Sequence, residues 1–191
     1  MYRTSPLALE SAKTLLETKD SRRVHILCKF GNHITACSYD TCVTQQEVLL
    51  CEARNAKIFW MAYAKLLPAW CGDFRRKAHK NDDVVNYLLD IGYHHLASMV
   101  EKIIITRNLS PSLGLIHHAQ SAHSKPLVYD LMELFRADLV DTTLLRYLRL
   151  KKQPIMEAQK HVGHFLHEVN MANSKLYYLR DFKQCHTYGY Y

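Results

Sequence analysis

The sequence predicts an all-α protein that folds as a single compact multi-helix domain. Only six glycines and five prolines interrupt its 191 residues, and 48% of the residues are apolar. These apolar residues recur mostly at the spacing that places them on one face of a helix, and no two segments show the alternation typical of paired strands. We expect the helical domain to span residues 1–183. Residues 184–191 lack helical periodicity and are expected to form a flexible tail.

The N-terminal region predicts two helical segments. Ser5 and Pro6 are suited to begin a helix that continues to about Lys19. The Asp20–Ser21 pair is predicted to break this helix, and a second amphipathic stretch follows over residues 24–30. Gly31 and Asn32 then end the helical pattern.

A well-marked helix start lies at Thr44. The segment Thr44-Gln-Gln-Glu47 matches a capping box, in which the first and fourth residues satisfy each other's backbone N–H groups. Residues 48–67 behind it predict a long helix that carries Glu52 among apolar residues. We expect this helix to be deeply buried.

A third helix is expected in the middle of the chain. A basic connection over residues 68–80 leads to three polar residues at 81–83, whose side chains can cap a helix that runs to about Arg107. Residues 108–122, which include a proline and a glycine, form the longest irregular segment.

Two more helices follow the irregular segment. The Lys125–Pro126 step is suited to begin a helix that ends near the basic run of residues 146–152. Pro154 is predicted to open the last helix, which completes an arrangement built from helices alone.

The chain is basic, and this suggests a polyanionic partner. Twenty-five Lys and Arg residues against 18 Asp and Glu residues give a net charge of +7. A positive surface attracts phosphates, so nucleic acid is the first partner to consider. The six cysteines contain no CxxC pair, which is typical of reduced thiols in the cytoplasm. No window approaches the roughly 18 uncharged apolar residues that a membrane span needs, and we expect no membrane association.

An imidazole and two carboxylates lie close together in the sequence. Asp130 and Glu133 are three residues apart and share one face of a helix, and His117 precedes them in the irregular segment. Carboxylates at such a distance repel each other unless a cation compensates them. Mg²⁺ and Mn²⁺ prefer oxygen ligands with an occasional imidazole. The sequence therefore predicts a divalent metal site.

Four motifs in fixed order carry a family resemblance. They are Glu52-Ala-x-x-Ala-x-x-Phe-Trp, Asn86-x-x-Leu, Leu113-Gly-Leu-Ile-His117 and Asp130-Leu-Met-Glu133-Leu-Phe-Arg136. Over about residues 44–150 the chain resembles the helical catalytic domain of the CRISPR-associated integrases, the Cas-one family. By that resemblance Glu52, His117 and Glu133 are metal ligands for Mg²⁺ or Mn²⁺. Asp130 is a further acid of the same site, and Lys125 lies near the scissile phosphate.

The resemblance also implies a reaction and its partners. A 3′-hydroxyl of a short DNA duplex attacks a phosphodiester of the CRISPR repeat, so double-stranded DNA is both spacer precursor and target in a prokaryotic cytoplasm. Because two DNA ends are joined, a homo-oligomer of at least two copies is expected. The β-rich domain that family members carry first has no room before Glu52, so we expect a compact member or a fragment. That domain borders the surface where the Cas-two partner subunit docks in typical members, so the resemblance leaves this partnership open.

Two groups of basic residues are candidates for contacts with the DNA backbone. The helix dipole by itself favours Lys and Arg near the C-terminal end of a helix. The alternative to a DNA contact is therefore an ordinary solvated surface. The candidates are Arg75, Arg76, Lys77, Lys80, Arg136, Arg146 and Arg149.

The residues are also compatible with two other functions. The first is a metal-dependent DNA endonuclease that uses water as the nucleophile with the same ligands; the His-Asp dipeptide of an HD-type hydrolase does not occur in the sequence. The second is a non-catalytic helical DNA-binding protein. It is disfavoured because clustered acids repel phosphates when no cation is present.

Overall fold

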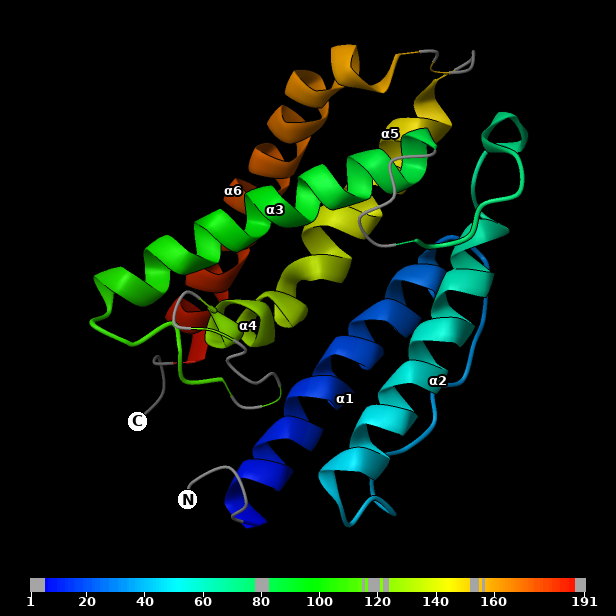
Figure 1. Ribbon diagram of the computed structural model, residues 1–191. Helices are drawn as coiled ribbons and strands as arrows, with labels where there is room; N and C mark the ends of the chain where they lie inside the picture. Colours follow the sequence, from blue (N-terminus) through cyan, green and yellow to red (C-terminus); the bar gives the residue numbers. More distant parts are fainter. Residues whose placement is uncertain are drawn as a thin grey trace.

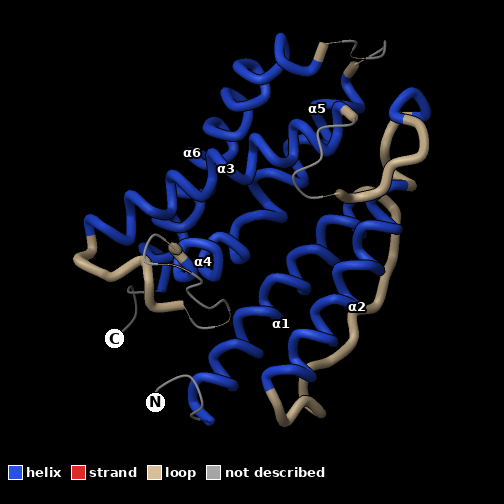
Figure 2. Tube along the Cα trace, in the orientation of Figure 1, coloured by secondary structure: helices blue, strands red, loops and turns tan. Residues whose placement is uncertain are grey.

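The computed structural model describes residues 6–77, 83–114, 116, 121, 124–151, 155 and 157–187, with side chains described up to residue 174. Every regular element in this part of the chain is helical, as Figure 2 shows, and the all-α prediction is confirmed. The elements are α1 (Pro6–Lys29), α2 (Gln45–Ala64), η2 (Ala69–Cys71), α3 (Val84–Thr106), α4 (Pro126–Arg136), η3 (Ala137–Asp141), α5 (Thr142–Leu150), η4 (Ala158–His161) and α6 (Val162–Thr187).

Helices α1 and α2 lie side by side and run in the same direction (Figure 1). The connection between them therefore runs back along the length of α2. Asn32, just after α1, donates a hydrogen bond to the carbonyl oxygen of Ala62 at the far end of α2, and the Cys37 N–H donates to the side chain of Asn55. This parallel pairing places the middle of α1 opposite the middle of α2.

The predicted break at Asp20 and Ser21 is wrong, because α1 continues without interruption to Lys29. The Asp20 carboxylate accepts hydrogen bonds from the Tyr39 hydroxyl, at 2.7 Å, and from the Asn55 amide, at 2.8 Å. We call these three buried residues the Asp20 network. A side chain that bonds to other elements does not compete for its own backbone, so the helix persists. Gly31, with a φ of 80°, follows the helix end.

The start of α2 confirms the predicted capping box. The Thr44 hydroxyl accepts from the Glu47 N–H, and the Glu47 carboxylate accepts from the Thr44 N–H. The expected deep burial of this helix is wrong, since only one face is covered. Leu49 and Leu50 are exposed, whereas Phe59 and others on the opposite side are buried.

The segment from α4 to α5 forms the centre of the domain. It packs against α1 on one side and against α3 and α6 on the other (Figure 1). The predicted single helix over this region contains a π-helical turn, η3, between α4 and α5, and the Thr142 hydroxyl donates to the carbonyl of Ala137 across that turn. The main core gathers here, with Leu144, Leu145 and Leu148 fully buried.

The remaining predicted boundaries are partly met. Asp83 caps α3 by accepting from the Asn86 N–H, as expected from the polar residues at 81–83. Pro154 lies outside the described residues, and α6 begins at Val162 after the short helix η4. Helix α6 extends to Thr187, beyond the predicted domain end at residue 183, and residues 188–191 are outside the described part.

No helix in the described part of the chain is both long enough and apolar enough to cross a bilayer.

Candidate functional site

Two of the predicted ligands meet at a lysine from a third helix. Glu52 of α2 and Glu133 of α4 approach the ammonium of Lys19, which comes from the middle of α1. The Lys19 Nζ atom lies 2.6 Å from Oε1 of Glu52 and 3.9 Å from Oε2 of Glu133. With Arg136, which pairs with Glu133, these residues form what we call the Lys19 cluster.

The cluster is buried on one side and open on the other. The side chains of Lys19 and Glu133 are 1% and 6% exposed, whereas that of Glu52 is 26% exposed. Solvent therefore reaches the cluster from the Glu52 side. An ion that entered from this side would meet the carboxylate of Glu52 first and that of Glu133 behind it.

The Glu133 carboxylate is held ionised although it is buried. Burial raises its pKa, but the positive charges of Arg136, Lys19 and Arg23 together outweigh this effect, and the pKa lies below its ordinary value. Arg136 donates a hydrogen bond to Oε1. The other oxygen, Oε2, is buried and accepts no hydrogen bond from the described residues. A charged oxygen without a donor is the type of ligand that a cation satisfies.

A second layer of polar residues supports Arg136 from inside the domain. Its guanidinium lies 4.0 Å from the centre of the Tyr93 ring, and the Tyr93 hydroxyl donates a hydrogen bond to Asp141 in the π-helical turn. Burial raises the pKa of Asp141, against the lowering effect of Arg23 and Arg136. This layer fixes the guanidinium, and the guanidinium in turn orients Glu133.

Asp130 lies on the same helix as Glu133 but has a different contact. Its buried carboxylate accepts a hydrogen bond of 2.9 Å from the backbone N–H of Ile116. The side chain of Gln45, at the start of α2, donates to the Ile116 carbonyl. Asp130 thus anchors the chain at Ile116, the residue before the predicted ligand His117.

The third predicted ligand, His117, lies outside the described residues. Within the described part, no three His, Cys, Asp or Glu side chains form a group that could hold a metal ion. The donor chemistry that is described nevertheless fits a hard divalent cation, because two carboxylates converge and one of their oxygens has no hydrogen-bond donor among the described residues. Glu52 and Glu133 are the residues that would hold it.

Lys125 forms an ion pair of 2.6 Å with Glu101 of α3, and its side chain is 48% exposed. Its predicted place near a scissile phosphate stays a prediction. The pair ties the start of α4 to α3, next to the segment that Asp130 anchors.

The predicted DNA-binding residues divide into two groups. Arg76 donates to Asn86 and to Asp90, and Arg136 pairs with Glu133, so both are engaged inside the domain. The Asn86 side chain also holds the backbone of residues 75 and 77, which gives the Asn-x-x-Leu motif a structural explanation. Lys80 is outside the described residues, and the remaining candidates are exposed: Arg75, Lys77, Arg146 and Arg149.

Sequence reasoning missed Lys19 and Arg23 as members of the polar interior. Both are buried, and the guanidinium of Arg23 lies 4.6 Å from the centre of the Phe59 ring. A signal was present, because Lys19 continues the helical spacing of the apolar residues Leu15 and Leu16. A charge on the apolar face of a predicted helix indicates a buried partner.

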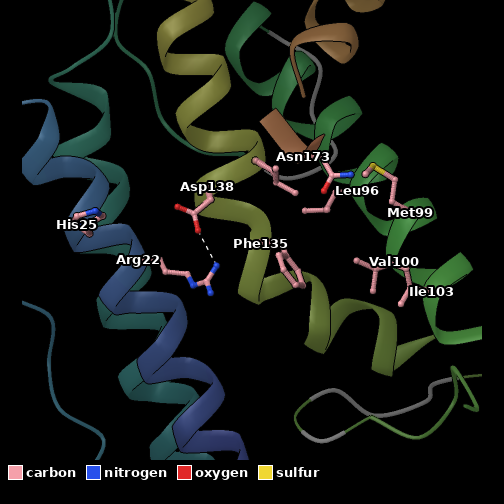
Figure 3. A pocket seen from close by; sticks show the side chains of 10 residues that line it. Arg22, His25, Leu96, Met99, Val100, Ile103, Phe135, Asp138 and Asn173 are labelled. Carbon is pink, nitrogen blue, oxygen red and sulfur yellow. Dashed lines mark hydrogen bonds and ion pairs between the residues drawn. The ribbon is translucent and has the colours of Figure 1, made fainter. Parts of the chain in front are cut away.

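An apolar cavity of about 320 Å³ lies apart from the Lys19 cluster, between α1, α3 and the α4–η3 segment. Figure 3 shows the ion pair of Arg22 and Asp138 on one side and Leu96 and Val100 on the other. Phe135 lines it and is two residues from Glu133, so the two side chains leave nearly opposite faces of the helix. Neither Glu52 nor Glu133 lines this cavity.

Comparison with known proteins identifies relatives over most of the chain. The family model described as CRISPR associated protein Cas1 matches residues 8–172. A CRISPR-associated endonuclease Cas1 of Saccharolobus solfataricus is 34% identical over 130 residues, which make up 63% of this chain and 37% of that protein. A Cas4 exonuclease/Cas1 endonuclease fusion of Leptospira interrogans is 42% identical over 69 residues, or 36% of this chain and 13% of the fusion.

Solved structures share the fold. A Cas1 protein from Thermotoga maritima superposes with a TM-score of 0.73 at 15% identity, covering 90% of this chain and 58% of that one. A casposase bound to its integration product superposes with a TM-score of 0.72 at 21% identity, covering 86% of this chain and 52% of that one. The chain thus spans well under two thirds of the length of these relatives.

Proposed function

The chain belongs to the Cas1 family of CRISPR-associated proteins, and from this premise we propose that it acts as a metal-dependent DNA integrase of CRISPR spacer acquisition. The observation that carries the proposal is the convergence of Glu52 and Glu133, from two different helices, on one cationic group. The relative bound to an integration product, and the relatives named endonucleases, support chemistry on DNA phosphodiesters.

Each residue of the site has a proposed task. Glu52 and Glu133 hold a Mg²⁺ or Mn²⁺ ion together with His117, and Arg136 keeps Glu133 ionised and oriented. When bound, such an ion lowers the pKa of an attacking 3′-hydroxyl and neutralises charge that develops on the phosphate. Asp130 positions the segment before His117. Lys125, which is half exposed, would be released from Glu101 to contact the scissile phosphate.

Double-stranded DNA is the proposed substrate, both as spacer precursor and as CRISPR repeat. A solved Cas1–DNA complex from among the structural relatives, with a TM-score of 0.58, supports a DNA partner. The exposed residues Arg75, Lys77, Arg146 and Arg149 are proposed to contact phosphates, because their charges face solvent. Joining two ends of one duplex requires two active sites, so we propose a homo-oligomer of at least two copies.

Hydrolysis of DNA is the second candidate, favoured by the endonuclease names of several relatives. The same ligands would serve it, with water in place of the 3′-hydroxyl as the nucleophile. The products distinguish the two reactions, because strand transfer joins two DNA strands whereas hydrolysis only cuts them.

The test is strand transfer of a short labelled duplex into a supercoiled plasmid that carries a CRISPR repeat, with Mn²⁺ and the purified chain. We expect Glu52→Gln, Glu133→Gln and His117→Ala each to reduce joined product by at least about 10²-fold, since each removes a ligand that acts in the transition state. Lys13→Met is the control, because Lys13 pairs with Glu10 on α1 away from the site.

Circular dichroism and thermal melting should show that all variants remain folded. Undiminished strand transfer by the three ligand variants would contradict the proposed site. Cut but unjoined DNA from the wild-type chain would favour the endonuclease instead.

A further inference from the structure

Lys19 is an unusual residue for a cation site because it brings a positive charge of its own. Its side chain is 1% exposed, and its ammonium forms ion pairs with the carboxylates of both Glu52 and Glu133. A fully buried lysine persists only with partners that compensate its charge, and here these partners are two of the ligands that the proposed function assigns to the metal.

The ammonium and a divalent ion compete for the same oxygen atoms. Carboxylate oxygens bind Mg²⁺ or Ca²⁺-sized ions at about 2.0–2.6 Å, and the Lys19 Nζ atom already lies 2.6 Å from one oxygen of Glu52. Oε2 of Glu133, which accepts no hydrogen bond from the part of the chain that the structure describes, lies 3.9 Å from the same ammonium. Two cations cannot share this space at such distances without strong repulsion.

We infer that Lys19 is a built-in counter-ion of the site: together with Arg136 it compensates the charges of Glu52 and Glu133 in the metal-free protein, and it must withdraw when a divalent cation binds. The inference rests on the proposed function, since it concerns the same carboxylates. Two facing carboxylates, one of them buried, would otherwise repel each other and destabilise the fold. The flexible four-carbon stem of lysine allows the ammonium to move away without a change in the helix.

The presence of Lys19 makes the affinity of the site for a divalent cation lower than the metal ligands alone would give. Every ion that binds must first displace the ammonium from Glu52 and leave its charge nearby. In physical terms, Lys19 keeps the metal-free fold intact and sets the concentration of divalent cation at which the site fills.

The test compares Lys19→Met with Lys13→Met in the full chain. Methionine keeps the length of the side chain and removes the charge, and Lys13 is a mostly buried lysine on the same helix that pairs with Glu10 instead. Mn²⁺ binding is measured by electron paramagnetic resonance of the free ion. We expect Lys19→Met to bind Mn²⁺ at least about tenfold more tightly than the wild type, and Lys13→Met to match the wild type.

Thermal melting gives a second readout that does not depend on activity. Without metal, Lys19→Met should melt below the wild type, and saturating Mn²⁺ should raise its melting temperature more than that of the wild type. Adding Glu52→Gln to Lys19→Met should restore part of the metal-free stability, because one of the two repelling charges is gone. Lys19→Arg keeps the charge and holds carboxylates with two donors, so it should weaken Mn²⁺ binding.

The outcomes separate this inference from the proposed function. Equal or weaker Mn²⁺ binding by Lys19→Met overturns the inference even if the wild type joins DNA. Tighter binding without any DNA joining supports the inference and contradicts the integrase. Absence of Mn²⁺ binding in all variants overturns both the inference and the metal site. If Lys19→Met does not fold even with Mn²⁺, the Lys19→Arg variant tests the inference instead. Mn²⁺ binding by Lys19→Arg that is as tight as that of the wild type would overturn the inference.

Discussion

The Asp20 network and the Lys19 cluster occupy neighbouring positions on the same two helices, yet they differ in what they can bind. Lys19 and Asp20 are consecutive on α1, and Glu52 and Asn55 are one turn apart on α2. In the Asp20 network one carboxylate oxygen receives two neutral donors and the other lies 3.8 Å from the guanidinium of Arg23, and the side chains of Asp20, Tyr39 and Asn55 are buried. In the Lys19 cluster two carboxylates face one ammonium.

The difference teaches what separates a structural contact from a cation site. The Asp20 network is sealed in the sense that all three of its side chains are buried, and one Asp20 oxygen holds both neutral donors. Burial and the hydrogen bond to Asp20 raise the pKa of Tyr39, which therefore stays a donor. The Lys19 cluster brings two carboxylates together and has an exposed edge at Glu52. The second carboxylate and the access of solvent favour ion binding there.

The largest effect on stability is expected when the sealed network is broken. Asp20→Ala removes the acceptor of the Tyr39 hydroxyl, one acceptor of the Asn55 amide and the negative charge beside the buried Arg23, and should lower the free energy of unfolding by about 3 kcal/mol. Urea denaturation measures this loss. Asp40→Ala, which removes an exposed aspartate bonded to Ser38, is the control and should change stability by less than about 0.5 kcal/mol. Equal losses in both variants would refute the structural role.

A smaller effect is expected when only one donor is removed from the network. Tyr39→Phe deletes the hydroxyl but leaves the Asn55 amide bonded to Asp20, so the free energy of unfolding should fall by about 1 kcal/mol. Mn²⁺ affinity should not change, since Tyr39 contacts neither Glu52 nor Glu133 in the described hydrogen bonds. A change in Mn²⁺ affinity as large as that of Lys19→Met would mean that the two clusters act as one.

The smallest effect concerns the dependence of stability on pH. Because the pKa of Glu133 is lowered in the folded state, its ionised form contributes stability above the ordinary value of about 4.5, and this contribution is lost as the pH falls through the folded pKa. The difference in unfolding free energy between wild type and Glu133→Gln should therefore shrink on acidification. Denaturant titrations from about pH 6 downward measure it, with the exposed Glu17→Gln as the control for loss of one negative charge. A constant difference would contradict the ionised, charge-paired Glu133.

Local signals made much of the fold predictable. The capping box at Thr44 and the cap at Asp83 act within four residues of the chain, and both are present in the structure. The supposed break at Asp20 failed because its side chain bonds to Tyr39 and Asn55, which are distant in sequence. Propensity alone cannot anticipate such a tertiary contact.

The site was predictable only in part. Glu52 and Glu133 were recognised from motifs, and the structure brings both to one ammonium. Lys19 was missed because it belongs to none of these motifs, although its place on an apolar helix face was visible. The role of Asp130 as an anchor of Ile116 depends on a backbone N–H, which no side-chain pattern reveals. The ligand role of His117 stays a prediction.

The π-helical turn at residues 137–141 has a consequence for how this domain can change over evolutionary time. A π-helical turn contains one residue more than an α-helical turn, and each residue rotates a helix by about 100°. Deleting one residue there would let α4 and α5 join smoothly, but the phase between Glu133 and the buried Leu144 would be lost. Either the face with Glu133 would then turn away from Lys19, or the face with Leu144 would turn away from the core. Insertions and deletions in this turn should therefore be selected against, even though no residue in it is a predicted ligand.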